Sequence, residues 1–113
     1  MDCDHHALPD AFLLSCPSRD LFTRLAEKWA LLCIVALAES PLRFGALRRR
    51  VQGVTQKMLT QTLRKLENDG LVHREMFDEM PLRVEYSLTA KGRDLLPLVK
   101  SFKVWAEENF ASK

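Results

Sequence analysis

The clearest hydrophobic pattern in the chain runs from Thr55 to Asn68. Leu59, Leu63 and Leu66 recur at i, i+4 and i+7, which is the spacing of one buried helix face. Thr55 is a favourable N-cap, and Gly70 stands where helices often end in a left-handed residue. The face opposite this stripe, with its flanks, carries amides, hydroxyls and cations but no carboxylate: Gln56, Lys57, Thr60, Gln61, Arg64 and Lys65.

The residues before this segment predict a second helix, a short strand and a third helix. Apolar side chains at helical spacing predict a helix from about Glu27 to Glu39, ended by Ser40-Pro41. Leu42-Arg43 suits a short strand, and Phe44–Val51 suits a short helix closed by three arginines. The turn Gln52–Val54 contains a glycine and leads into the helix at Thr55, so we predict a helix-turn-helix.

After Gly70 the pattern changes from helical spacing to alternation. Leu71–Phe77 and Leu82–Leu88 read as two strands of a hairpin, with Val84, Tyr86 and Leu88 facing inward. A hairpin that directly follows the second helix of a helix-turn-helix makes a winged helix. We therefore predict a mainly α fold with a small β-hairpin wing.

Arg83 lies on the predicted wing and has two interpretations. Its guanidinium could enter a minor groove or contact a phosphate of DNA. It could equally form an ion pair with Glu79 or Glu85, which are close in the sequence.

The last predicted helix, from Ala90 to about Phe110 with Thr89 as its cap, carries a long apolar stripe. Pro97 inside it costs roughly 3 kcal/mol in a straight helix, so we expect a kink. A helix with a bare apolar face needs a partner, and a two-fold mate is the commonest solution. A dimer would place two reading helices about 34 Å apart on one face of B-DNA.

The start of the chain is less patterned. Residues 1–14 resemble a tail, and residues 15–113 form one predicted domain. Cys16-Pro17-Ser18 suits the first turn of a helix that carries Phe22 and Leu25 on its apolar side.

Charge is unevenly distributed along the 113 residues, although the net charge is only +2. Residues 43–93 carry a net charge of +5, and the remainder of the chain carries −3. Residues 43–65 hold seven basic side chains and no acidic one. This polarity suits neutralisation of phosphates, so we expect double-stranded DNA as a partner.

Several function classes find no support in the sequence. No apolar run reaches about 18 residues, and the start is acidic rather than basic, so we expect a cytoplasmic protein that does not enter a membrane. There is no Gly-rich phosphate loop, H-E-x-x-H or nucleophile elbow. The histidines lack metal-ligand spacing, and the Cys3–His6 cluster lies on the tail. We expect no enzyme activity, no metal and no cofactor.

Two functions remain open from the residues alone. The first is a DNA-binding regulator. The second is a winged-helix adaptor that binds proteins and not DNA, because this fold does not dictate its use. A basic stretch without acids favours the regulator.

Seven short motifs occur in a fixed order over residues 16–100: Cys16-Pro17, Lys28-Trp29-Ala30-Leu31-Leu32, Arg43-Phe44-Gly45-Ala46-Leu47-Arg48, Gln56-Lys57-Met58-Leu59-Thr60-Gln61, Leu63-Arg64-Lys65-Leu66-Glu67, Asp69-Gly70-Leu71-Val72 and Arg83-Val84-Glu85-Tyr86-Ser87-Leu88-Thr89. Together they resemble the HxlR family of bacterial transcription regulators, which are MarR-like winged helix-turn-helix proteins. The chain departs from that pattern at Ala26-Glu27, where the family commonly has two glycines, so the first two helices can run closer to continuous.

The resemblance implies a homodimer joined through the first and last helices, acting as repressor or activator on a pseudo-palindromic operator. It implies a recognition helix at Thr55–Asn68 and a wing at about Arg74–Val84. Our predicted DNA contacts are Arg43, Arg48, Thr55, Gln56, Lys57, Thr60, Gln61, Arg64, Lys65 and Arg83. Our predicted dimer contacts are Phe22, Leu25, Leu95, Leu98, Val99, Phe102, Trp105 and Phe110.

Cys16 is a candidate redox sensor, since some members of the family resemble sensors with a cysteine at this place. A thiol at a helix N-terminus is in a positive field that favours the reactive thiolate. The alternative is a small, packed and inert residue. The effector would be an oxidant or an unknown small molecule, and the sequence does not identify it.

Overall fold

The computed structural model describes residue 27 and residues 29–110. The predicted tail, the helix expected after Cys16, and Phe22 and Leu25 lie outside these residues. The described elements are α2 (Ala30–Glu39), β1 (Leu42–Arg43), α3 (Phe44–Arg50), α4 (Gln56–Asn68), β2 (Val72–Phe77), β3 (Arg83–Leu88) and α5 (Ala90–Phe110).

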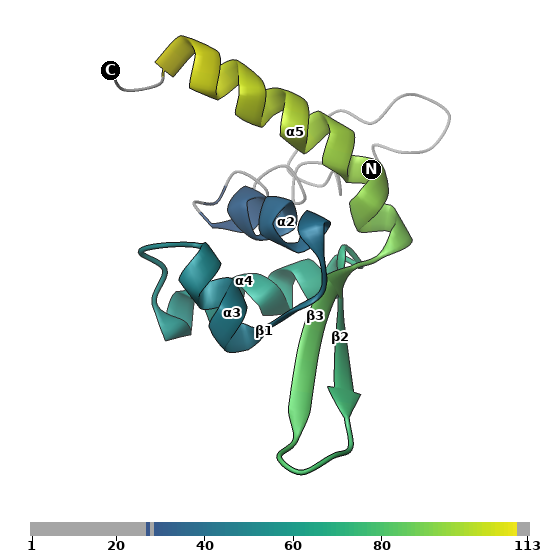
Figure 1. The fold of residues 1–113 in the computed structure, drawn as a ribbon. Coiled ribbons are helices and arrows are strands. Elements are labelled where there is room, and N and C mark those ends of the chain that lie inside the picture. The colour runs from purple at the N-terminus through teal and green to yellow at the C-terminus, as the bar shows by residue number, and fades with distance from the viewer. Residues whose placement is uncertain (1–26, 28, 111–113) are drawn as a thin grey trace, which may run out of the picture.

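The elements form a helical body with a hairpin on one side and a long helix on the other. Figure 1 shows α2, α3 and α4 packed together, the β2–β3 hairpin projecting beyond them, and α5 crossing on the far side of α2. The three strands make one antiparallel sheet in the order β1-β3-β2. The fold is a winged helix-turn-helix, as the sequence predicted.

The core lies where α2, α3 and α4 meet the inner end of the hairpin. Its largest fully buried side chains come from all three helices: Cys33, Ile34, Leu37, Leu47, Leu59, Leu63 and Leu66. The apolar stripe predicted on residues 55–68 is therefore the inward face of α4. Val99 is also buried, and it brings α5 into the same core.

Helix α2 begins three residues later than predicted, at Ala30 instead of Glu27. The Ala30 N–H donates to the Glu27 carbonyl in a turn, and Trp29 is the N-cap. The first bond with helical i to i+4 spacing joins the Cys33 N–H to the Trp29 carbonyl. The backbone at Glu27 thus belongs to the turn that enters the helix.

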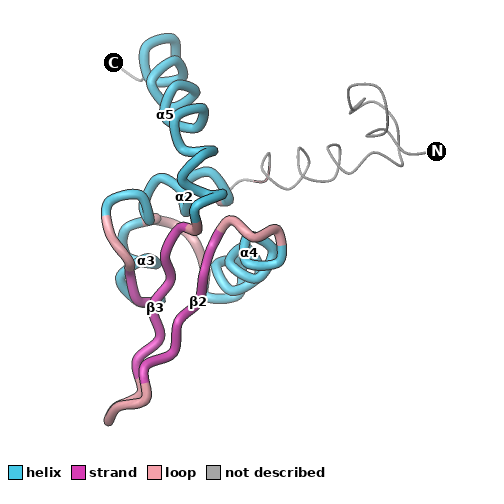
Figure 2. The backbone as a smooth tube through the Cα atoms, turned by 90° about the vertical axis from the view of Figure 1, so that its right-hand side faces the viewer, coloured by secondary structure: helices cyan, strands magenta, loops and turns pink. Residues whose placement is uncertain are grey.

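The hairpin strands each begin one residue later than predicted, and the first of these shifts has a clear cause. The Leu71 N–H donates to the carbonyl of Leu66, so Leu71 completes the C-terminal cap of α4. The expected alternation of buried and exposed residues in β3 is also wrong for most of the strand. Only Leu88 is buried, because the hairpin extends past the helices and its outer part has no core to face (Figure 2).

The start of α5 is fixed to the end of α4 and the start of the hairpin. The Thr89 hydroxyl donates to the Gly70 carbonyl at 2.6 Å and accepts the Gly92 N–H at 3.0 Å. The Thr89 N–H donates to the Leu71 carbonyl at 3.1 Å. The predicted cap is confirmed, and it also joins three elements at one residue.

Helix α5 contains Pro97, and its ribbon changes direction in the N-terminal half, as expected for an internal proline (Figure 1). Beyond that point much of its apolar surface stays exposed. The exposed large side chains are Leu98, Phe102, Val104, Trp105 and Phe110.

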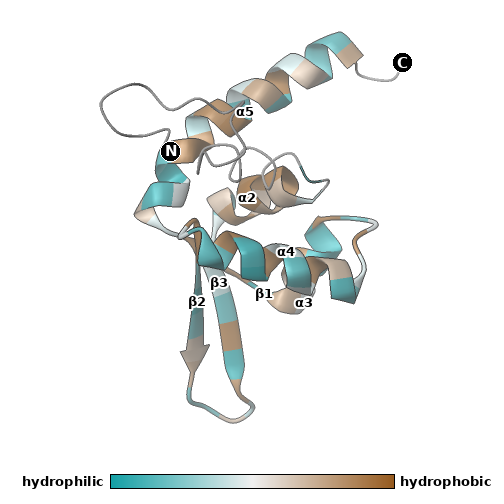
Figure 3. Cartoon of the chain, turned by 180° about the vertical axis from the view of Figure 1, so that it is seen from behind, coloured by the Kyte–Doolittle hydropathy of each residue, from teal (hydrophilic) through white to brown (hydrophobic). Residues whose placement is uncertain are grey.

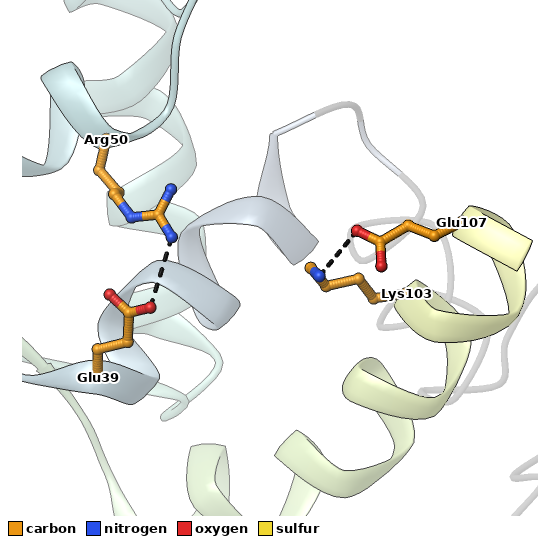
Figure 4. A network of polar contacts seen from close by, with 4 residues as sticks. All are labelled: Glu39, Arg50, Lys103 and Glu107. Carbon is orange, nitrogen blue, oxygen red and sulfur yellow. Dashed lines mark hydrogen bonds and ion pairs between the residues drawn. The ribbon is translucent and has the colours of Figure 1, made fainter. Parts of the chain in front are cut away.

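Two ion pairs flank α2 in Figure 4. Arg50 at the end of α3 lies 3.4 Å from Glu39 at the end of α2, and Lys103 lies 2.8 Å from Glu107 within α5. All four side chains are largely exposed, so each pair contributes at most about 1 kcal/mol. Arg50 therefore already has an ionic partner within the chain.

Across the described residues, no helix combines the length and the apolar character that a membrane span requires.

Candidate nucleic-acid interface

Helix α4 has the two ends that the sequence predicted. The Thr55 hydroxyl accepts the Met58 N–H at 3.1 Å, which satisfies one of the free donors of the first turn. At the other end Gly70 has φ +77°, a conformation that L side chains rarely adopt. These two signals explain why the helix occupies Gln56–Asn68.

The outward face of α4 is polar and carries no acid over its first nine residues. Gln56, Lys57, Gln61 and Arg64 are exposed, and Thr60 is partly exposed. The colours along α4 in Figure 3 are largely hydrophilic. We call these five residues the reading face. Within the described part of the chain, no ion pair engages Lys57 or Arg64.

Two hydroxyls predicted to contact DNA also serve the helix itself. The Thr55 hydroxyl acts as the N-cap, and the Thr60 hydroxyl donates to the Gln56 carbonyl at 2.8 Å. Each hydroxyl oxygen still has acceptor capacity. The two amides of this face, Gln56 and Gln61, are therefore its side chains best suited to read a base edge.

Helix α3 places basic side chains next to the turn that precedes α4. Arg48 is exposed, and together with Arg49 it lines an open cleft of about 440 Å³ over the turn at Gln52–Val54. Gly53 has φ +94° in this turn, so the tight connection between α3 and α4 requires a glycine. The predicted contact Arg48 thus lies at the helix-turn-helix junction, whereas Arg43 lies on β1 opposite Glu85.

Lys65 occupies the flank of α4 and is already paired. Its Nζ lies 3.1 Å from a carboxylate oxygen of Glu27, which is 38 positions away in the sequence. Both side chains remain nearly half exposed. A DNA phosphate at Lys65 would have to compete with this carboxylate.

Arg83 forms the ion pairs that one of its two interpretations predicted, and it pairs with both candidates. Its guanidinium contacts Glu79 at 3.3 Å and also Glu85, and it lies 3.8 Å from the centre of the Phe77 ring. The hydrogen bond to Glu79, followed by that to Glu85, raises the pKa of Arg83. Its charge is therefore balanced within the wing itself.

A cation that the sequence-based list omitted lies closer to the reading face. Arg74 of β2 lines a cleft of about 360 Å³ with Thr60, Arg64 and Glu67 of α4. Arg74 pairs in register with Tyr86, one of the residues predicted to face inward. The register of the hairpin was the signal that could have identified Arg74, since directly opposite residues of a hairpin share a face.

The predicted dimer contacts fall into two groups. Leu98, Phe102, Trp105 and Phe110 are exposed on α5. Val99 is buried and Leu95 is packed against the core, so these two side chains already contact their own chain.

No group of three or more metal-ligating side chains occurs in the described ranges 27 and 29–110. Cys33 is fully buried in α2, and desolvation raises the pKa of its thiol to about 12. It is therefore a neutral core residue near pH 7. Cys16 lies outside the described residues.

A family model described as HxlR-like helix-turn-helix matches residues 24–113. The chain belongs to this family. It is an HTH-type transcriptional regulator, and the expectation that it is not an enzyme is confirmed by the family.

Named relatives agree with this assignment. An uncharacterized HTH-type transcriptional regulator of Methanothermobacter thermautotrophicus is 42% identical over 83 residues, which are 74% of this chain and 63% of that protein's length. The structure of a transcriptional regulator ytfH from Salmonella typhimurium matches with a TM-score of 0.82 and 39% identity, covering 88% of this chain and 89% of that one. The redox regulator HypR in its oxidized form matches with a TM-score of 0.77 and 41% identity, covering 83% and 97%.

Proposed function

We propose that this regulator binds a pseudo-palindromic operator as a homodimer, with the reading face of α4 in the major groove. The single observation that carries the proposal is that face, which is exposed, free of carboxylates and set on a well-capped helix. A regulator that reads an operator acts where the genome is, which supports a cytoplasmic location.

The side chains of the reading face match the chemistry of the groove. Glutamine can bond both the N6 and N7 positions of adenine, and arginine or lysine can bond guanine or a phosphate. On this basis Gln61 is the base-reading residue, and Lys57 and Arg64 supply charge. Arg48, at the helix-turn-helix junction, adds a contact to the sugar–phosphate backbone of the DNA.

The dimer is supported by the exposed apolar surface of α5. Leu98 is 69% exposed and Phe110 is 76% exposed, with Phe102 and Trp105 between them. Monomeric proteins rarely leave such a surface bare along one helix. A second copy packed on it would present two reading faces about one turn of DNA apart, or about 34 Å.

The DNA-binding part is tested by selecting bound sequences from a random duplex pool and measuring variants on the selected operator. Gln61→Ala should relax preference at one base pair, by roughly 1–3 kcal/mol. Arg64→Ala should weaken binding to all duplexes and make the logarithmic salt dependence shallower by about 0.9. Lys100→Ala removes a cation from α5, outside the helix-turn-helix and the hairpin, and is the control that should change neither property. The reading face is wrongly assigned if both α4 variants bind like the wild type.

The dimer is tested by sedimentation of wild-type protein and of Phe102→Asp and Trp105→Asp. Each aspartate would place a charge on the apolar surface, so both variants should sediment as monomers with unchanged far-UV circular dichroism. A wild-type protein that is monomeric at micromolar concentration would refute the dimer.

The likeness to HypR favours a second element, a response to oxidants through Cys16. We propose Cys16 because it precedes Pro17 at a predicted helix start, where a positive field favours the thiolate. Cys33 is buried with a pKa of about 12 and therefore lacks the thiolate that reacts. Treatment with diamide should alter operator binding by the wild type and leave Cys16→Ser unaffected, whereas Cys33→Ala should still respond. Mass spectrometry without reductant would identify the modified thiol, and modification that spares Cys16 would disprove its role.

A further inference from the structure

The cleft between α4 and the hairpin contains two arginines from different elements. Arg64 comes from α4 and Arg74 from β2, and the cleft of about 360 Å³ between them is lined by polar groups of both elements. Within the described residues no ion pair engages either arginine. Glu67 also lines the cleft, so the two cations and one carboxylate leave a net positive charge.

The strand register shows which hairpin face meets α4. Arg74 lies opposite Tyr86, and both line the cleft with α4 residues. Glu75 lies opposite Glu85, and Phe77 lies opposite Arg83. Since successive strand residues point to opposite faces, Arg83 and Glu85 occupy the other side of the hairpin from Arg74. Glu79, in the turn between the strands, pairs with Arg83.

The geometry of DNA relates this cleft to a phosphate. A sugar–phosphate strand separates each major groove from the next minor groove. With α4 in the major groove, a hairpin that reaches the adjacent minor groove lies on the other side of that strand. The cleft between α4 and β2 is the corresponding place on this protein, and guanidinium groups bind phosphate oxygens well.

We propose that the α4–hairpin cleft seats a phosphodiester group of the operator backbone, with Arg74 and Arg64 as its ligands. The hairpin thus contributes to DNA binding through Arg74 at its base, while Arg83 contributes no phosphate contact. Glu67 weakens the site because its carboxylate repels the same phosphate. This assignment rests on the proposed function, since it presumes that α4 enters the major groove.

The experiment compares operator and unrelated duplexes at several salt concentrations for the wild type, Arg74→Ala, Arg74→Lys, Arg83→Ala and Glu67→Gln. Loss of one phosphate contact should reduce the logarithmic salt slope by about 0.9, equivalent to roughly eightfold weaker binding at 0.1 M salt. Arg74→Ala should show this loss on both duplexes. Arg74→Lys, which keeps the charge, should retain the slope.

The other two variants separate this proposal from its alternatives. Arg83→Ala is the matched control on the opposite face and should keep the wild-type slope. Glu67→Gln should bind roughly two- to fivefold more tightly, the range for one exposed charge interaction. Circular dichroism verifies that each variant is folded.

The outcomes distinguish the two levels of the proposal. A wild-type protein that binds no duplex overturns the DNA-binding function and this site with it. A wild-type protein that binds, with Arg74→Ala retaining its slope, overturns this site alone. A slope lost in Arg83→Ala and kept in Arg74→Ala would assign the phosphate contact to the other face of the hairpin.

Discussion

Replacing Gly92 by alanine tests how tightly the base of α5 is held against the hairpin. A Cβ at this position would lie 2.3 Å from the Leu71 carbonyl oxygen, 0.7 Å closer than the 3.0 Å below which real Cβ atoms essentially never approach another atom. The obstacle is backbone, so it cannot rotate away like the end of a side chain. It would also meet Leu88 Cδ2 at 3.2 Å, which leaves little room on the other side.

The cost of Gly92→Ala can be estimated from these contacts. Forcing extra atoms into a packed site costs about 1–3 kcal/mol. Moving Leu71 also strains the hydrogen bond that its carbonyl accepts from Thr89, worth about 1 kcal/mol. Alanine recovers about 0.5–1 kcal/mol because it is a better helix former than glycine. We expect a net destabilisation of about 1–3 kcal/mol.

Gly45→Ala is the matched control, because it makes the same chemical change in a helix with space. Its Cβ would meet only Arg49 Nη1, at 3.5 Å. This variant should gain about 0.5–1 kcal/mol. Urea unfolding followed by circular dichroism, at one protein concentration throughout because a dimer unfolds with concentration dependence, measures both. A Gly92→Ala protein as stable as the wild type, or equal losses in both variants, would refute the packing argument.

Three further expectations follow from single contacts. Cys33 should resist thiol reagents in the native protein near pH 7, and peptide mapping that finds it rapidly labelled in the folded protein would contradict this. Unfolding lowers the pKa of Cys33 from about 12 to the ordinary 9.0, so the free energy of unfolding should fall as pH rises between these values, which urea titrations at several pH values check. Glu27→Gln should release Lys65 and steepen the salt dependence of DNA binding, and an unchanged slope would mean that Lys65 is far from phosphate. Because the ion pair is exposed, this variant should change the free energy of unfolding by less than about 1 kcal/mol. Thr55→Ala should destabilise the protein by about 1 kcal/mol through loss of the bond from the Met58 N–H, measured by urea unfolding, and a stability equal to the wild type would deny the cap an energetic role.

Local signals predicted the elements that carry the fold. The N-cap Thr55 and the positive-φ Gly70 bound α4, and Thr89 marks the start of α5, so both helices have the predicted positions. These signals act over a few residues, and a sequence displays them directly. Leu71 was assigned to a strand because its bond to Leu66 belongs to a cap that the apolar pattern does not reveal.

Charges predicted from the sequence were harder to place because their partners are set by the fold. Lys65 pairs with Glu27 across 38 positions, which no spacing rule anticipates. The sequence placed Arg83 on the wing and offered Glu79 or Glu85 as its partner, whereas in the structure Arg83 contacts both. Arg74 required the register of the hairpin, which alone shows that it faces α4.

The Thr89 hydroxyl gives the molecule a mechanical property. It bonds the Gly70 carbonyl just beyond α4 and the Gly92 N–H inside α5, so one oxygen atom joins the two long helices. A tilt of α5 about its base must either break this bond or drag the C-terminal end of α4 along. The helix that carries the apolar surface can thus transmit a tilt through Thr89 to the helix that carries the reading face.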